Sequence, residues 1–152
     1  IGKYFKIEDV AIKDAIENYI PTNNRSQLIE KNNNQIILDA YNANPSSMAA
    51  AIENFIQINK ESKVVILGDM FELGEWAAGE HQAILDWVHS NAPHWSVWTV
   101  GPLYAACTRP AKRTFATTEE ALNELNSAAL KGATVLIKGS RGMALEQLLP
   151  AL

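Results

Sequence analysis

Several features of secreted, membrane-spanning and nucleic-acid-binding proteins are missing from the sequence. Cys107 is the only cysteine, which excludes an internal disulfide and a thiolate metal site, so we expect a reducing, cytoplasmic setting. No apolar run approaches the roughly 20 residues of a membrane helix, and no signal peptide is visible. Lys and Arg number 13 against 17 Asp and Glu, a net charge of −4, whereas a broad nucleic-acid surface needs clustered cations. We therefore expect neither a membrane nor a nucleic acid as a partner.

Standard phosphate-binding and metal-binding motifs are also absent. Neither Gly-x-x-x-x-Gly-Lys-Ser/Thr nor Gly-x-Gly-x-x-Gly occurs, so this chain lacks the usual cradle for any nucleotide that it binds. The histidines His81, His89 and His94 lie in or near one expected helix and form no metal cluster. His81 lies close to an acidic loop, and two alternatives stay open for it: packing of the helix, which the pattern favours, or contact with a ligand. We expect no metal ligand in the chain.

The 152 residues, 47% hydrophobic and 20% charged, suit one ordinary globular domain. Short apolar runs alternate with helical patterns, which predicts an α/β, Rossmann-like three-layer domain with a mainly parallel sheet flanked by helices. A hairpin-type turn at 31–34 predicts one antiparallel edge strand. The expected strands are Gln27–Glu30, Gln35–Asp39, Val64–Leu67, Ser96–Val100, Arg113–Ala116 and Ala133–Ile137.

Helix signals fall between these strands. Asn44 is an expected N-cap before Pro45, and Met48, Ile52, Phe55 and Ile56 form an apolar stripe after it. A second helix is expected over Glu75–Ser90, with Ala77, Ala78, Leu85 and Val88 inward. Thr117-x-x-Glu120 predicts a capping box for a third helix, with Leu122, Leu125 and Ala129 inward and a stop at Lys131-Gly132. A last helix is expected over Met143–Leu149.

The first 26 residues differ from the rest. A helix is expected over Ile7–Tyr19, because apolar residues recur along one face and Pro21 ends it. The polar stretch Pro21–Ser26 then reads as a linker or domain boundary. The chain does not begin with Met, so we expect it to be a piece of a longer protein.

Polar residues follow three of the expected parallel strands, where ligands bind in such folds. After the second strand, Asp39 can accept hydrogen bonds from a ribose diol, and the following helix N-terminus can hold an anion. The alternative is that Asp39, Asn42 and Asn44 only satisfy turn and cap hydrogen bonds.

Two further loops carry charge. Asp69 and Glu72 lie between Gly68 and Gly74 and suit an amine or a metal-bound group, with a solvated acidic loop as the alternative. Lys138, Ser140 and Arg141 follow the last strand and suit a phosphate or a carboxylate. Three polar loops at one sheet edge are stronger evidence for a site than any one of them.

The motifs Asp39-Ala-Tyr-Asn-Ala-Asn-Pro, Leu67-Gly-Asp-Met-Phe-Glu-Leu-Gly and Lys138-Gly-Ser-Arg, with Pro21-Thr-Asn-Asn-Arg before them, resemble the C-terminal domain of a Mur ligase. The resemblance covers essentially the whole chain and is strongest to the member that adds D-alanyl-D-alanine to UDP-N-acetylmuramoyl-tripeptide. It implies that residues 1–24 are the tail of a central ATPase domain and a linker, and that 25–152 are the C-terminal domain. The full enzyme would be an ATP- and Mg²⁺-dependent, amide-forming ligase of bacterial peptidoglycan synthesis. The other domains would hold most of the ATP and Mg²⁺, and this domain alone would be inactive.

The resemblance also implies roles for residues. Arg25 would reach the ATP phosphates, Asp39 the ribose, and Asn42 and Asn44 would shape the nearby pocket. The implied dipeptide side comprises Asp69 and Glu72 toward the ammonium, Lys138, Ser140 and Arg141 toward the carboxylate or the transferring phosphate, and His81. No residue of this chain is implied as catalytic.

A different class of protein competes with this interpretation. Asp39, Asp69, Thr99 and Lys138 at successive strand ends resemble a receiver-like, phospho-accepting signalling domain. Such domains have paired acids after the first strand and Lys-Pro after the last, whereas Asp39 has no acidic neighbour and Gly139 follows Lys138. An interaction module with degenerate loops is a third alternative, if the parent protein has lost activity.

Overall fold

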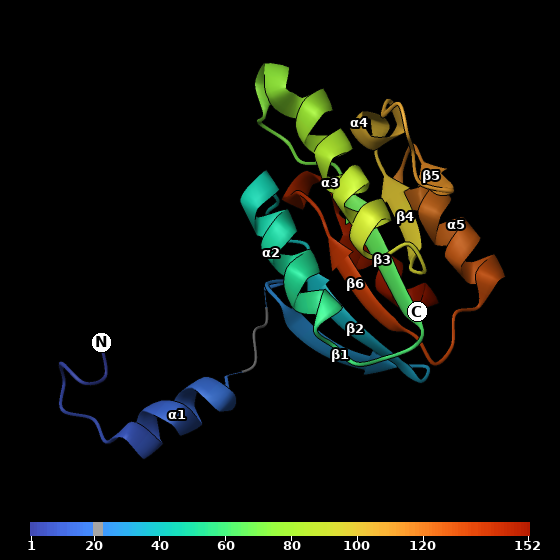
Figure 1. Ribbon diagram of the computed structural model, residues 1–152. Coiled ribbons are helices and arrows are strands. Elements are labelled where there is room, and N and C mark those ends of the chain that lie inside the picture. Colours follow the sequence, from blue (N-terminus) through green and yellow to red (C-terminus); the bar gives the residue numbers. More distant parts are fainter. Residues whose placement is uncertain (20–22) are drawn as a thin grey trace.

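The computed structural model describes residues 1–19 and 23–152, in which six strands form one sheet with helices on both faces (Figure 1). The strand order is β1-β2-β6-β3-β4-β5, with β1 and β2 antiparallel and every other pair parallel. This confirms the predicted mainly parallel sheet and its antiparallel edge strand. The strands are β1 (Gln27–Lys31), β2 (Asn34–Asp39), β3 (Lys63–Gly68), β4 (Ser96–Val100), β5 (Arg113–Phe115) and β6 (Thr134–Lys138).

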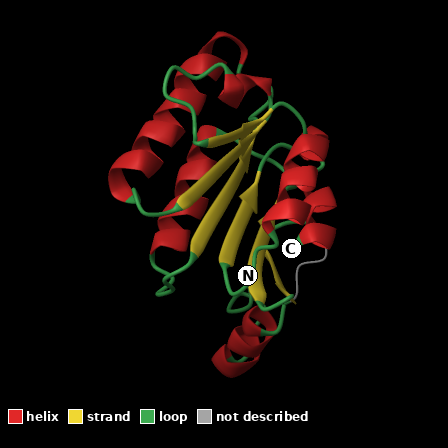
Figure 2. Cartoon of the chain, turned by 90° about the vertical axis from the view of Figure 1, so that its right-hand side faces the viewer, coloured by secondary structure: helices red, strands yellow, loops and turns green. Residues whose placement is uncertain are grey.

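Helices cover the sheet from both sides, as Figure 2 shows. Their bounds are α2 (Pro45–Ile56), α3 (Ala77–Asn91), α4 (Pro102–Ala105), α5 (Thr118–Ala128) and the 3₁₀ helices η1 (Gly74–Trp76), η2 (Arg141–Met143) and η3 (Leu145–Ala151). Side chains alternate along β3, so Val65 and Leu67 join the core under α2 and α3. Val64 and Ile66 join the opposite core, under α5 and η3. Burial on both faces explains why the strands read as uninterrupted apolar runs.

Local signals fix several element ends. The Asn44 side chain accepts a hydrogen bond from the Ser47 N–H, the Ser47 hydroxyl accepts one from the Asn44 N–H, and Pro45 opens α2. The predicted cap is therefore confirmed. Asn32 and Asn33 both have left-handed φ angles, 50° and 65°, as a type I′ hairpin turn requires.

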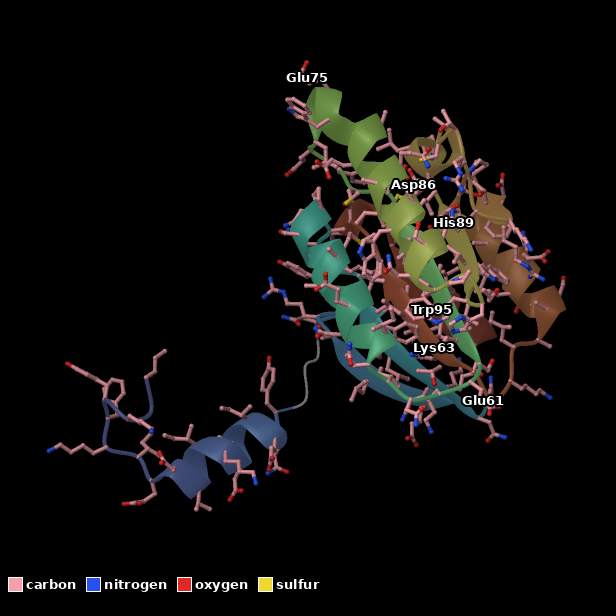
Figure 3. All side chains as sticks on the ribbon, viewed as in Figure 1. Glu61, Lys63, Glu75, Asp86, His89 and Trp95 are labelled. Carbon is pink, nitrogen blue, oxygen red and sulfur yellow. The ribbon has the colours of Figure 1, made fainter. Side chains whose placement is uncertain are left out.

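A buried lysine, Lys63, caps the C-terminal end of α2. The Lys63 ammonium donates to the carbonyl oxygens of Phe55 and Ile56 at 2.9 and 3.1 Å. It lies 5.3 Å from the centre of the Phe55 ring and 5.1 Å from that of Trp95 (Figure 3). Burial lowers the pKa of Lys63. This ammonium offsets the negative C-terminal end of a helix that has no basic residue in its last turn.

Three helix predictions need correction. The second begins as the 3₁₀ turn η1 and becomes α-helical at Ala77, and Ala78 is exposed rather than inward. The third ends at Ala128, because Ala129 is left-handed, with φ 45°, and exposed, so the stop precedes Lys131-Gly132. Its capping box is half formed, since Thr117 caps the Glu120 N–H but the Glu120 carboxylate accepts from Ala116. The last helix is two 3₁₀ helices, because Ala144, with φ 50°, interrupts it.

The N-terminal helix α1 (Asp9–Glu17) lies apart from the sheet in Figure 1, and none of its residues is buried. It is shorter than the predicted 7–19, and Pro21, the predicted stop, lies outside the described residues. The domain boundary after residue 24 stays a prediction. No helix in the described ranges is long and apolar enough to span a bilayer.

Candidate functional site at the carboxyl edge of the sheet

The three predicted loops emerge from one edge of the sheet. Lys138 at the end of β6 is in register with Asp39 at the end of β2 and with Leu67 near the end of β3. Asp69 lies two residues after Leu67, and Ser140 lies two residues after Lys138. The prediction that Asp39, Asp69 and Ser140 share one sheet edge is therefore confirmed.

Asp39 and Lys138 form an ion pair between neighbouring strands. The Lys138 ammonium lies 2.6 Å from Asp39 Oδ2 and also donates to the carbonyl oxygen of Asn42 at 3.1 Å. The Ser26 N–H donates to Asp39 Oδ1 at 3.2 Å. The lysine side chain is only 2% exposed and that of the aspartate 19%, so pairing offsets the desolvation of both charges. Part of Asp39 also faces a groove of about 250 Å³ between α2 and β1–β2.

Arg25 lies beside the same strand end. Its guanidinium stacks 3.8 Å above the centre of the Tyr41 ring, and both residues are exposed. Sequence reasoning did not single out Tyr41, although an aromatic residue next to a candidate anion-binding loop was a usable signal. The stacking places the Arg25 charge over Tyr41, two residues after Asp39.

Asn42 and Asn44 make local turn and cap hydrogen bonds, as the alternative to nucleotide binding predicts. Asn42 Oδ1 accepts from the Ala43 N–H at 2.9 Å, and Asn44 Oδ1 accepts from Ser46 Oγ and Ser47 N–H, both at 2.9 Å. Both asparagines are exposed. Their proposed part in nucleotide binding stays a prediction.

Asp69 is fully buried and binds protein groups. Its two carboxylate oxygens accept from the N–H groups of Leu103 and Tyr104 at 3.0 Å each, which caps the start of α4. Its own N–H donates to the carbonyl of Val100 at 3.1 Å. Asp69 thus joins the loop after β3 to the end of β4. Direct contact of this carboxylate with a dipeptide stays a prediction.

His81 is also fully buried, at the start of α3. Its Nδ1 lies 2.6 Å from the carbonyl oxygen of Ala77, and its Nε2 lies 2.9 Å from the Met70 nitrogen. A neutral imidazole with its proton on Nδ1 satisfies both contacts, so this hydrogen-bond pattern assigns the tautomer. The geometry matches the packing alternative for His81, and a ligand contact stays a prediction.

Ser140 joins the loops that follow β3 and β6. Its N–H donates to the Asp69 carbonyl at 3.1 Å, and its Oγ accepts from the Phe71 N–H at 2.8 Å. The Phe71 ring lies against Gly142, where an added Cβ would come within 2.7 Å of it. The spacing of the motifs gave no signal for this contact.

Glu72 and Arg141 are the predicted dipeptide-side residues that reach solvent. Glu72 is exposed and has a left-handed φ of 65°. The Arg141 side chain is 58% exposed and pairs with Glu146 at 2.9 Å. Within residues 1–19 and 23–152, no group of three or more His, Cys, Asp or Glu side chains is placed to hold a metal ion.

Comparison with known families shows which family the chain belongs to. The sequence pattern of the family described as "Mur ligase, glutamate ligase domain" matches residues 24–141. The chain belongs to the Mur ligase family. Several relatives carry the name UDP-N-acetylmuramoyl-tripeptide–D-alanyl-D-alanine ligase, and two of them illustrate the similarity. The one from Treponema pallidum is 42% identical over 124 residues, which are 76% of this chain and 27% of the relative. The one from Rickettsia prowazekii is 32% identical over 132 residues, 84% of this chain and 29% of the relative.

Solved structures show the same fold. A ligase of this kind from Acinetobacter baumannii superposes with a TM-score of 0.80 at 27% identity, over 98% of this chain and 33% of that one. The MurF ligase from Thermotoga maritima, solved in complex with ADP, has a TM-score of 0.79 at 21% identity, over 99% of this chain and 34% of that one. This Mur ligase domain thus spans about a third or less of these proteins. The comparisons give no support to the receiver-domain alternative.

Proposed function

We propose that this chain is the C-terminal domain of a UDP-N-acetylmuramoyl-tripeptide–D-alanyl-D-alanine ligase. The full-length protein would add the dipeptide to the tripeptide precursor in bacterial peptidoglycan synthesis, in the cytoplasm and with consumption of ATP. The observation that carries this proposal is the 42% identity to a relative of that name. The three polar loops gathered at one sheet edge support it further.

The proposed reaction has two steps. ATP transfers its terminal phosphoryl group to the tripeptide carboxylate, giving an acyl phosphate and ADP. The free amine of D-alanyl-D-alanine then attacks the acyl carbon and loses a proton to solvent as the new amide bond forms. Inorganic phosphate leaves with the electron pair of the broken C–O bond. Such chemistry depends mainly on positioned charges and excluded water. We assign Mg²⁺ and most of the ATP contacts to other domains of the same protein, as the family resemblance implies.

The nucleotide half of the site would lie at the end of β2. We assign to it Arg25, Asp39, Asn42 and Asn44. Support comes from the exposed Arg25 guanidinium, which stacks on Tyr41, and from the partly exposed Asp39 carboxylate at the end of β2. A guanidinium suits phosphate oxygens, and a carboxylate suits ribose hydroxyls.

The dipeptide half would lie over the loops after β3 and β6. Glu72 and Arg141 present opposite charges to solvent there, which match the ammonium and carboxylate of a zwitterionic dipeptide. Asp69, His81, Lys138 and Ser140 lie buried behind these loops and complete the assigned set. None of these residues is assigned as a catalytic acid or base.

The test uses the full-length protein that contains this chain. Phosphate release would be followed with ATP, UDP-N-acetylmuramoyl-tripeptide and a panel of acceptors: D-alanyl-D-alanine, L-alanyl-L-alanine and D-alanine. We expect release that requires the tripeptide precursor and is fastest with D-alanyl-D-alanine. Release that ignores the dipeptide, or that prefers a single amino acid, would overturn the proposal. The 152-residue chain alone is the negative control.

A further inference from the structure

Two buried polar residues at and just after the end of β6 bond to the two strands on either side of it or to the loops that follow them. Lys138, 2% exposed, bonds to Asp39 and Asn42, which belong to β2 and the loop after it. Ser140, 4% exposed and two residues further on, bonds to Asp69 and Phe71 in the loop after β3. Because β6 lies between β2 and β3, the segment 138–140 is the joint between the two halves of the candidate site.

Close packing leaves this joint little freedom. An added Cβ on Gly139 would lie 2.9 Å from the Gly68 Cα and 2.7 Å from Leu145 Cδ1. The backbones of β3 and β6 therefore approach more closely than side chains permit, and Leu145 fills the space beneath them.

The residues bonded to Lys138 and Ser140 lie close in the chain to exposed charged side chains, or bond to a neighbour of one. Asp39, held by Lys138, also accepts from the Ser26 N–H, next to the exposed Arg25. Phe71, held by the Ser140 hydroxyl, directly precedes the exposed Glu72. Each buried side chain thus fixes the backbone of a different half.

We infer that Lys138 and Ser140 are positioning residues that serve separate halves of the site. The Lys138 ammonium orients the nucleotide half through Asp39 and Asn42, and the Ser140 hydroxyl orients the acceptor half through the Phe71 N–H. The inference rests on the proposed function and deepens it. It moves Lys138 from the dipeptide half to the nucleotide half, because the Lys138 ammonium bonds to Asp39 and Asn42. It also assigns the Lys138 and Ser140 side chains to protein contacts and leaves Glu72 and Arg141 to meet the dipeptide.

The test compares Lys138→Met and Ser140→Ala in the full-length ligase by steady-state kinetics. We expect Lys138→Met to raise the KM for ATP about tenfold and that for D-alanyl-D-alanine less than about twofold, with the reverse for Ser140→Ala. Lys138→Gln, which can still donate to Asp39, should recover part of the loss. It also replaces Lys138→Met if that variant fails to fold.

Matched controls separate positioning from general support of the fold. Lys63→Met removes a similarly buried ammonium at the opposite edge of the sheet, and Ser127→Ala removes an exposed hydroxyl that bonds within α5. Both should leave the two KM values unchanged, whatever they do to the unfolding temperature.

The outcomes are distinguishable. If both KM values rise together in Lys138→Met and in Ser140→Ala, the positioning assignment is overturned while the proposed function stands. The same holds if Lys138→Met, like Lys63→Met, leaves both KM values unchanged. If the wild-type protein forms no amide bond with D-alanyl-D-alanine, both the proposed function and the positioning assignment are overturned.

Discussion

Gly101 and Asp69 occupy adjoining space so closely that a Cβ on the glycine would lie 2.3 Å from the aspartate carboxylate. Gly101 has a φ of 121°, which L side chains rarely adopt, and it directly precedes the α4 turn that Asp69 caps. A glycine at the end of β4 is therefore what lets a carboxylate from the loop after β3 reach the start of α4.

Gly101→Ala should destabilise the fold by about 1–3 kcal/mol from backbone strain alone, and further through displacement of the Asp69 carboxylate. Urea unfolding measures the change. Gly79→Ala is the matched control, because Gly79 lies within α3 with open space around its Cα. That variant should gain up to about 1 kcal/mol from helix propensity. Equal effects of the two substitutions would contradict the packing described for Asp69.

The Tyr104 hydroxyl is buried and has no hydrogen-bond partner among residues 1–19 and 23–152. Tyr104→Phe removes this uncompensated polar group and keeps the ring that packs edge-on against His81. We expect the variant to be as stable as wild type at pH 7, or more stable by about 1 kcal/mol. A loss of more than about 1 kcal/mol in urea unfolding would mean that the hydroxyl makes a stabilising bond.

Tyr104 should also contribute to alkaline unfolding. Burial raises the pKa of Tyr104 well above its usual value, with further contributions from the nearby Asp69 and Cys107 charges. Above about pH 10 the unfolded chain loses this proton while the folded protein keeps it, so the free energy of unfolding falls as pH rises. Between pH 9 and 11 wild type should lose more stability than Tyr104→Phe. Tyr4→Phe, at an exposed position, is the control and should follow wild type.

His81 variants separate a structural role from ligand contact. His81→Leu leaves the buried Met70 N–H without its partner, at a cost of about 1–3 kcal/mol, whereas His81→Gln retains an acceptor near the Nε2 position. We expect unfolding stability and dipeptide use to fall together in His81→Leu and to recover in part in His81→Gln. If His81→Gln is as stable as wild type but loses dipeptide use entirely, His81 contacts the ligand.

The cap at Asn44 is open to a simple test. Asn44→Ala should cost about 1 kcal/mol, and Asn44→Asp should retain most of the stability, because a carboxylate oxygen can also accept from the Ser47 N–H. Thermal unfolding of the chain measures both. A stable Asn44→Ala variant would show that Pro45 alone suffices to begin α2.

The elements that the sequence predicted well are those governed by local patterns. Ser96–Val100 matches β4 residue for residue, and Asn44-Pro45 correctly located the start of α2. The 3₁₀ helices at the C-terminus were missed, because the left-handed turn at Ala144 depends on tertiary packing, and alanine carries no signal for it.

The site was predictable in position but not in its internal bonding. Strand-end residues were correctly grouped, since parallel strands bring their carboxyl ends together. The partners of Lys138, however, lie 99 and 96 residues away in the chain, and the Ser140–Phe71 bond spans 69. No pattern in one sequence tells a buried, paired charge from an exposed one, so the burial of Asp69, His81, Lys138 and Ser140 appears only in the structure.

The most direct test of the central claim is mass spectrometry of the reaction product. The full-length protein would be incubated with ATP, UDP-N-acetylmuramoyl-tripeptide and isotope-labelled D-alanyl-D-alanine. We predict one product, in which the labelled dipeptide is joined to the tripeptide with loss of one water molecule, and none when ATP is omitted. ATP hydrolysis without that product, or incorporation of a single amino acid in its place, would contradict the account.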